Sequence, residues 1–265
     1  KSKFGMCVIY GRRRIGKSYL LQEFSKNKNT VFYTATKVGT ERNLELFSET
    51  LLNIIAPELQ DVKFNSLESV FDYLTAKLES DYKKEKLLLI IDELPYWAEK
   101  DESLLSVLQK YIDEKWLNKN LKIILCGSSL SFMENKILCE KSPVFGRRDI
   151  QIKLEPFNYA ETALFVPKYS FEEKAIVYGI TGGVAKYLSV LNPKISLYEN
   201  IKNQFFKTDG YLYDEPRNLL VQEFSDVTIV NNIIEQIAHG QNQVNLIAEK
   251  LGESSPAVLY SLEKL

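Results

Sequence analysis

The residues best suited to chemistry stand in one short stretch, VIYGRRRIGKSYLLQEF, residues 8–24. It contains the spacing Gly11-x-x-x-x-Gly16-Lys17-Ser18, which is typical of a phosphate-binding P-loop. In such a loop the backbone N–H groups surround phosphate oxygens, the lysine reaches the β- and γ-phosphates, and the serine hydroxyl ligates Mg²⁺. The sequence therefore predicts a nucleotide-phosphate site formed by Gly11, Arg12, Arg13, Arg14, Ile15, Gly16, Lys17, Ser18 and Tyr19.

The three consecutive arginines of this loop, residues 12–14, raise a question of charge. Like charges so close together repel each other, so a negatively charged group is expected nearby. Two partners fit this expectation, the triphosphate itself or the acids of a neighbouring subunit. The sequence leaves both open.

A second candidate group follows the apolar run LLLII, where Asp92 ends the run and Glu93 comes next. In P-loop enzymes that hydrolyse nucleotides, the first such carboxylate serves the Mg²⁺ shell and the second polarises the attacking water. We predict these two roles for Asp92 and Glu93. The alternative is an acidic strand end that faces solvent, and the presence of a P-loop in the same chain disfavours it.

Two further segments complete the candidate catalytic set. In LCGSS, Ser128 is predicted to sense the γ-phosphate by hydrogen bonding, and Ser129 to cap the next helix. In VFGRRDI, Arg147 and Arg148 precede a strand pattern. An arginine there could stabilise transition-state charge, in cis or across a subunit boundary, or could simply be solvated at the surface.

The elements that must position these residues alternate between strand and helix patterns, which is typical of a parallel sheet covered by helices. The expected strands are 4–10, 30–36, 86–92, 121–127 and 149–154, and the expected helices 18–26, 41–56, 66–82 and 103–117. The helical period places Leu104 and Trp116 in the core. Helices broken at Pro167, Gly182-Gly183, Pro193 and Gly210 follow, and three short helices from about Val227 resemble a helix-turn-helix.

Composition limits what the chain can bind and where it works. Lys plus Arg (34) nearly balances Asp plus Glu (35) in 265 residues, so no overall field draws the chain to nucleic acid or to a membrane. No apolar run approaches the length of a membrane span. The three cysteines form no CxxC pair, and we expect a reducing, cytoplasmic location. Both ends look cut, since Lys1 nearly begins a strand and Leu265 ends on a helical pattern.

Taken with YGITGGVAKYL and YDEPRNLLVQEF, these motifs resemble the STAND/AAA+ ATPases, specifically the archaeal-type ATPases related to origin-recognition initiators. The resemblance covers essentially the whole chain. It implies an α/β P-loop fold with a five-stranded parallel sheet in the order 5-1-4-3-2, then an α-helical lid, then a partial winged-helix domain. The implied limits are 1–157, 158–224 and 225–265. It also implies ATP and Mg²⁺ as ligands.

The lid segment departs from its relatives. Many of them read Gly-Gly-x-Pro, whereas this chain has Gly182-Gly183-Val184-Ala185. Gly183 would still let the backbone approach the nucleotide, but Ala185 lacks the ring that the proline of those relatives places near the base. Lys186 is a candidate lid cation, or an ordinary lysine on the surface of a helix.

The favoured interpretation is an ATP-binding protein that hydrolyses ATP slowly as a conformational switch. The alternative is a DNA-binding regulator with ATP as a structural ligand. A small-molecule kinase is disfavoured, because it needs a lid rich in arginine and the helical region after residue 158 offers mainly Lys and Glu. A homo-oligomer, and a DNA or protein partner at the helix-turn-helix, are left open; no membrane partner is expected. His239 is the only histidine and has no partners for a metal site, so it is expected to be an ordinary residue at a helix end.

Overall fold

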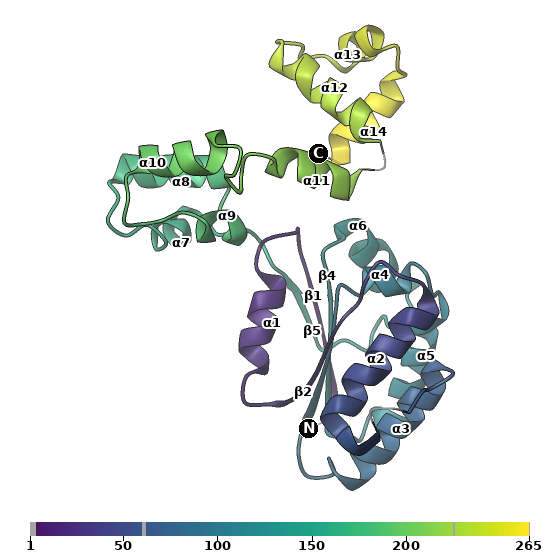
Figure 1. Cartoon of the computed structure of the whole chain (residues 1–265). Helices are drawn as coiled ribbons and strands as arrows, with labels where there is room; N and C mark the ends of the chain where they lie inside the picture. The colour runs from purple at the N-terminus through teal and green to yellow at the C-terminus, as the bar shows by residue number, and fades with distance from the viewer. Residues whose placement is uncertain (1–3, 60–61, 225, 265) are drawn as a thin grey trace. The chain divides into compact units, whose positions relative to one another are not determined.

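The computed structural model describes residues 4–59, 62–224 and 226–264 (Figure 1). Contacts divide the chain into two compact units, one of residues 1–164 with 178–188 and the other of residues 165–177 with 189–265. The domain limits 1–157, 158–224 and 225–265 stay predictions, and residues 1, 225 and 265 lie outside the described residues.

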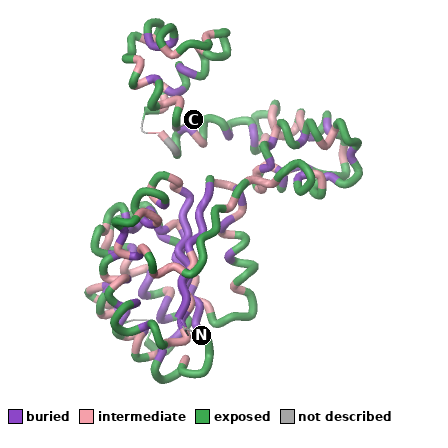
Figure 2. The backbone as a smooth tube through the Cα atoms, turned by 180° about the vertical axis from the view of Figure 1, so that it is seen from behind, coloured by how far each residue is buried: buried purple, intermediate pink, exposed green. Residues whose placement is uncertain are grey.

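A five-stranded parallel sheet forms the centre of the first unit. Its order is β2-β3-β4-β1-β5, which confirms the predicted order read from the other edge. The strands are β1 (Gly5–Tyr10), β2 (Asn29–Thr34), β3 (Leu87–Asp92), β4 (Leu121–Gly127) and β5 (Ile150–Lys153). β3 and β4 are nearly continuous apolar runs because helices cover the sheet on both faces. The buried strands stand out in Figure 2.

Helices cover the two faces unequally. On one face lies α1 (Lys17–Ser25), whose Leu21 packs in a small cluster with Ile9, Ile90 and Ile124. The other face carries α2 (Thr40–Ile55), α3 (Leu67–Ser80), α4 (Pro95–Ala98) and α5 (Ser103–Tyr111), with the short α6 (Leu130–Phe132) after β4 (Figure 1). The predicted helix 103–117 is present, but it ends in a π-helical turn, Ile112–Trp116.

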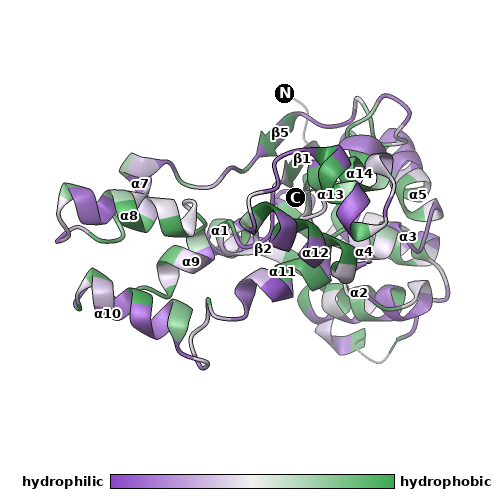
Figure 3. Cartoon of the chain, turned by 90° about the horizontal axis from the view of Figure 1, so that it is seen from above, coloured by the Kyte–Doolittle hydropathy of each residue, from purple (hydrophilic) through white to green (hydrophobic). Residues whose placement is uncertain are grey.

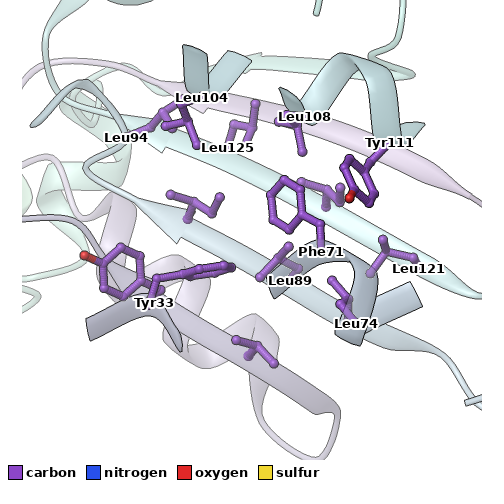
Figure 4. Close-up of a cluster of buried hydrophobic side chains, with 14 of the residues drawn as sticks. Tyr33, Phe71, Leu74, Leu89, Leu94, Leu104, Leu108, Tyr111, Leu121 and Leu125 are labelled. Atoms are coloured by element: carbon purple, nitrogen blue, oxygen red, sulfur yellow. The ribbon is translucent and has the colours of Figure 1, made fainter. Parts of the chain in front are cut away.

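The main core lies on this second face (Figure 4). Leu104 and Trp116 are fully buried in it, as predicted. Several of its aromatic rings meet edge to face, with the centroids of Phe71 and Trp116 5.0 Å apart. The indole N–H of Trp116 donates to the Thr75 hydroxyl at 2.9 Å, so this buried polar group is satisfied.

The segment after the sheet is helical, as expected. Its helices are α7 (Tyr159–Ala163), α8 (Phe171–Thr181), α9 (Ala185–Ser189), α10 (Leu197–Ile201) with a π-turn Lys202–Phe206, and α11 (Glu215–Glu223). Each predicted break falls between two of them: Pro167, Gly182-Gly183, Pro193 and Gly210. Most of these helices carry both hydrophobic and hydrophilic residues (Figure 3).

Three helices end the described chain: α12 (Val227–Ala238), α13 (Val244–Leu251) and α14 (Ser255–Lys264). They share a small core of Ile233, Ile247, Ala248 and Val258. Gly252 ends α13 in the left-handed conformation, at φ 68°. His239 ends α12, and its Nδ1 lies 2.8 Å from the Glu235 carbonyl, which confirms a residue at a helix end. Up to residue 264 no strand follows, so the winged helix stays a prediction.

Candidate functional site

The loop Gly11–Gly16 joins β1 to α1 at the carboxyl edge of the sheet, as its motif requires. Ile15 anchors the loop in the interior, with only 4% of its surface exposed. A side chain at Gly11 would place its Cβ 2.3 Å from the Leu154 carbonyl oxygen, so only glycine fits there. Arg14 (φ 69°) and Gly16 (φ 96°) are left-handed, and such alternation turns successive N–H groups toward a common centre.

Lys17 is the buried cation of this loop, with 5% of its surface exposed. Its ammonium donates to the carbonyls of Gly11 at 2.9 Å and Arg12 at 2.7 Å, so it is held across the mouth of the loop. Burial lowers the pKa of Lys17, and the positive charge of Arg13 lowers it further, against the opposing effects of Cys126, Glu93 and Asp92. A negatively charged ligand would favour the charged form.

Ser18 and Asp92 form the first of two hydroxyl–carboxylate pairs. The Ser18 hydroxyl donates to Asp92 Oδ2 at 2.6 Å, and Oδ1 accepts the N–H of Glu93 at 3.0 Å. Asp92 ends β3 and is 1% exposed. Beside it, burial and then the charge of Asp92 raise the pKa of the Cys126 thiol, so Cys126 stays a neutral core thiol.

Glu93 and Ser128 form the second pair. The Ser128 hydroxyl donates to Glu93 Oε2 at 2.7 Å, so the two predicted catalytic residues meet although they lie on different strand ends. Glu93 adopts a left-handed backbone, φ 50°, and Leu94 then donates its N–H to the Cys126 carbonyl at 2.9 Å. Ser129 caps α6, accepting the N–H of Phe132 at 3.4 Å, which confirms that prediction.

The three arginines of the loop have three different surroundings. The side chain of Arg12 is exposed. Arg13 Nη1 donates to the hydroxyl of Tyr96 at 2.8 Å. Arg14 accepts the backbone N–H of Lys186 on its carbonyl at 3.0 Å. Tyr19, the last residue of the predicted set, begins the outer face of α1 and is 68% exposed.

Gly183 lies close to the chain that leaves β5. Its φ is 69°, its carbonyl accepts the N–H of Phe157 at 2.9 Å, and an added Cβ would fall 1.8 Å from the Phe157 carbonyl oxygen. The approach of the Phe157 backbone thus explains this glycine, and contact with a nucleotide stays a prediction. Lys186 is exposed at the start of α9, with its backbone against the loop.

Arg147 and Arg148 do not lie with the other predicted catalytic residues. They precede β5, and Asp149 donates its N–H to Met6 at the beginning of β1, so they stand at the amino edge of the sheet. Arg147 forms a fork to Asp113, with N–O distances of 3.1 and 2.8 Å. The six residues of β1 separate this edge from the P-loop by about 20 Å. The cis alternative therefore does not fit, and the trans alternative stays a prediction.

Sequence reasoning assigned no role to Tyr96 or Lys37. Tyr96 lies on α4, three residues after Glu93, and receives both the Arg13 hydrogen bond and the Lys37 ammonium, 5.1 Å from its ring centroid. The motif DELPYW contains the tyrosine, but nothing in it marks Arg13 as its partner.

The comparisons decide the family. Residues 1–191 match the model of an ATPase domain found predominantly in Archaea. The chain belongs to this ATPase family. It is 29% identical over 251 residues to an uncharacterized protein of Methanocaldococcus jannaschii, an alignment that covers 95% of this chain and 53% of the relative. The chain thus spans about half the length of the curated relative that it matches.

Solved structures support the fold of this ATPase family member. A Walker-type ATPase of Pyrococcus abyssi superposes with a TM-score of 0.70 at 22% identity, over 98% of this chain and 84% of that one. The ORC2 protein of Aeropyrum pernix, in ADPNP–ADP complexes, gives 0.63 at 14% identity, over 93% and 72%. At these identities the likeness establishes the P-loop fold.

The donor set can be tested against Mg²⁺. Within the described ranges, no group of three or more His, Cys, Asp or Glu side chains could hold a metal by itself. A hydroxyl and a carboxylate 2.6 Å apart, beside a phosphate-binding loop, instead fit a cation that keeps several waters and shares the phosphates. Among the residues with defined positions, no helix combines the length and apolar character needed to cross a bilayer.

Proposed function

We propose that the chain binds ATP with Mg²⁺ and hydrolyses it to ADP and phosphate, as a switch. One observation carries the proposal: a buried lysine and two hydroxyl–carboxylate pairs, Ser18–Asp92 and Glu93–Ser128, meet at one edge of the sheet. Buried charges are costly unless they serve a partner or a ligand, so their concentration here supports a binding and reaction site.

Each group has a distinct task in the proposed reaction. Lys17 binds the β- and γ-phosphates, and the loop N–H groups hold their oxygens. Ser18 and Asp92 would hold Mg²⁺, which neutralises phosphate charge when bound. Glu93 takes a proton from the attacking water. The oxygen of that water bonds to the γ-phosphorus while the bond between this phosphorus and the ADP oxygen breaks. Ser128 fixes the carboxylate of Glu93 through its hydrogen bond, and the sensing of the γ-phosphate by Ser128 stays a prediction.

The switch part of the proposal depends on a contact between the loop and the lid segment. The backbone N–H of Lys186 donates to the carbonyl of Arg14, a residue of the loop that would surround the phosphates. Three residues later, at residue 189, the chain passes from the first unit back into the second one. A change in the loop on hydrolysis would therefore pass directly into the chain that leads to the helical unit.

The alternative of a DNA-binding regulator receives less support from charge. Residues 226–264, which contain the helix-turn-helix, have five acidic residues and two lysines. DNA binding depends on neutralising phosphates with Lys and Arg, and this segment carries the opposite excess. A homo-oligomer and a protein partner at these helices stay predictions.

The experiment compares the two adjacent acids. Glu93→Gln keeps shape and hydrogen bonding but removes the base, so ATP affinity should survive while single-turnover hydrolysis falls about 10²–10⁴-fold. Asp92→Asn should reduce both Mg²⁺-dependent binding and turnover. Parental hydrolysis by Glu93→Gln would overturn the mechanism, and a parent that does not bind ATP would overturn the proposed function.

A further inference from the structure

The residue of interest is Arg13, the middle arginine of the phosphate loop. Its guanidinium donates to the Tyr96 hydroxyl at 2.8 Å and lies 5.8 Å from the centroid of the same ring. Tyr96 follows the Asp92-Glu93 pair by one short turn, on α4. Arg13 therefore reaches from the loop toward the end of β3, where the water-activating carboxylate lies.

The position of Lys17 shows which end of the triphosphate would lie beside Arg13. Its ammonium is held at the Gly11 and Arg12 carbonyls, at the first turn of the loop. Since the lysine of this motif binds the β- and γ-phosphates, the first turn is the γ-phosphate end. Arg13 comes directly after Arg12, so it stands at the γ-phosphate end of the loop, with Tyr96 on the side of Glu93.

Tyr96 also reduces the cost of gathering positive charge here. Lys37, which follows β2, places its ammonium 5.1 Å from the centroid of the same ring. Two cations and the buried ammonium of Lys17 would repel one another, while the negative face of an aromatic ring attracts cations. The hydrogen bond and the ring of Tyr96 thus help to hold Arg13 in one place.

We propose that Arg13 is a cis-acting arginine of this ATPase: positioned by Tyr96, it binds the γ-phosphate and stabilises the charge that develops there during transfer. The inference rests on the proposed ATP site and gives a specific role to one residue of its loop. It assigns the function of an arginine finger to the loop itself, so a lone chain has a cation at the γ-phosphate besides Lys17.

A γ-phosphate contact predicts selective effects. Arg13→Ala should lower single-turnover kcat about 10²-fold, because it removes a preorganised donor from the developing charge. It should reduce affinity for ATP–Mg²⁺ more than affinity for ADP–Mg²⁺, since ADP lacks the γ-phosphate. Arg13→Lys keeps the charge without the planar fork and should recover part of the rate.

Tyr96 is a positioning residue, and its variants separate positioning from stability. Tyr96→Phe keeps the ring for Lys37 but loses the hydrogen bond, so kcat should fall about 3–10-fold with the same selectivity for ATP over ADP. Arg42→Ala is the matched control, because Arg42 is exposed on α2 and pairs with a surface acid, Glu45. It should change neither nucleotide affinity nor rate.

The measurements are titration calorimetry with ATP–Mg²⁺ and ADP–Mg²⁺, and single-turnover hydrolysis, for the parent and all variants. If Arg13→Ala lowers affinity for ATP and ADP equally, or keeps the parental rate, the proposal for Arg13 is wrong while the ATP site stands. If the parent binds neither nucleotide, the proposed function fails first. Thermal unfolding of each variant identifies losses that come from misfolding.

Discussion

The two edges of the central sheet carry similar residue types in opposite environments. At the carboxyl edge, Lys17 and Asp92 are almost fully buried and bonded to groups from neighbouring strands and loops. At the amino edge, Arg147 and Asp113 form an ion pair whose side chains are 29% and 42% exposed. An exposed ion pair has a small desolvation cost and adds little to folding stability, whereas buried charged groups need hydrogen-bond or ionic partners. The difference in burial, more than the residue types, distinguishes a site from a surface.

The largest effect beyond the Glu93 contrast is expected from Lys17, compared with a lysine of the amino edge. Lys17→Ala removes the cation fixed at the loop mouth, so affinity for ATP–Mg²⁺ should fall about 10²-fold, the loss of charge-assisted hydrogen bonds. Lys122→Ala is the matched control, because Lys122 is a half-buried lysine beside Gly5 and Asp149 at the amino edge. Isothermal titration of both variants checks the comparison. Equal affinities would remove the distinction between the edges.

The lowered pKa of Lys17 predicts two pH trends of opposite sign. In the folded chain burial lowers this pKa below 10.5, so between the two values the unfolded chain binds more protons. The free energy of unfolding should therefore gain from Lys17 as the pH rises through this window, while ATP affinity falls as the ammonium is lost. Urea unfolding and calorimetry, each compared with Lys17→Met, measure both trends. If the pH dependence of unfolding free energy and of ATP affinity were the same in parent and variant, the lowered pKa of Lys17 would be contradicted.

The parts of this site that could be predicted are those whose residues are identified by one short sequence segment or by the order of the strands. Gly11, Lys17 and Ser18 lie in one motif, and Asp92-Glu93 closes a continuous apolar run, so their positions follow from chain order alone. The pairing of Glu93 with Ser128 follows too, because neighbouring parallel strands end at the same edge. The location of Arg147 was also readable, since a residue that precedes a parallel strand stands at the opposite edge from a residue that follows one.

Other features had no local signal. Arg13 and Tyr96 are 83 residues apart, and their hydrogen bond depends on how α4 turns after β3. The reason for Gly183 is a backbone approach from Phe157, which a glycine in the sequence cannot reveal. Tertiary contacts of this kind need the fold before they can be assigned.

A smaller effect concerns the backbone of Glu93. Its φ of 50° disfavours most side chains, so Glu93→Gly should be more stable than Glu93→Ala by about 1 kcal/mol, although both lack the carboxylate. At Glu99, a right-handed residue that ends α4, the same pair should show the reverse order. Chemical denaturation of the four variants checks this. If Ala were more stable than Gly at position 93 as well as at position 99, the left-handed turn at Glu93 would carry no strain.

The smallest effect is expected at the amino edge within a single chain. Arg147→Ala breaks the exposed pair with Asp113 and should cost about 0.2–1 kcal/mol of stability, with single-chain ATP binding unchanged. A trans role would appear only between copies, because the strand length separates this arginine from its own loop. The Arg147→Ala, Arg148→Ala double variant is then mixed with the Lys17→Ala variant. At one kind of interface in the mixture, the double variant supplies the intact loop and the Lys17→Ala variant supplies the intact arginines. Recovery of turnover in the mixture, against none in Lys17→Ala alone, would support the trans role; no recovery at any ratio would leave the amino edge as ordinary surface.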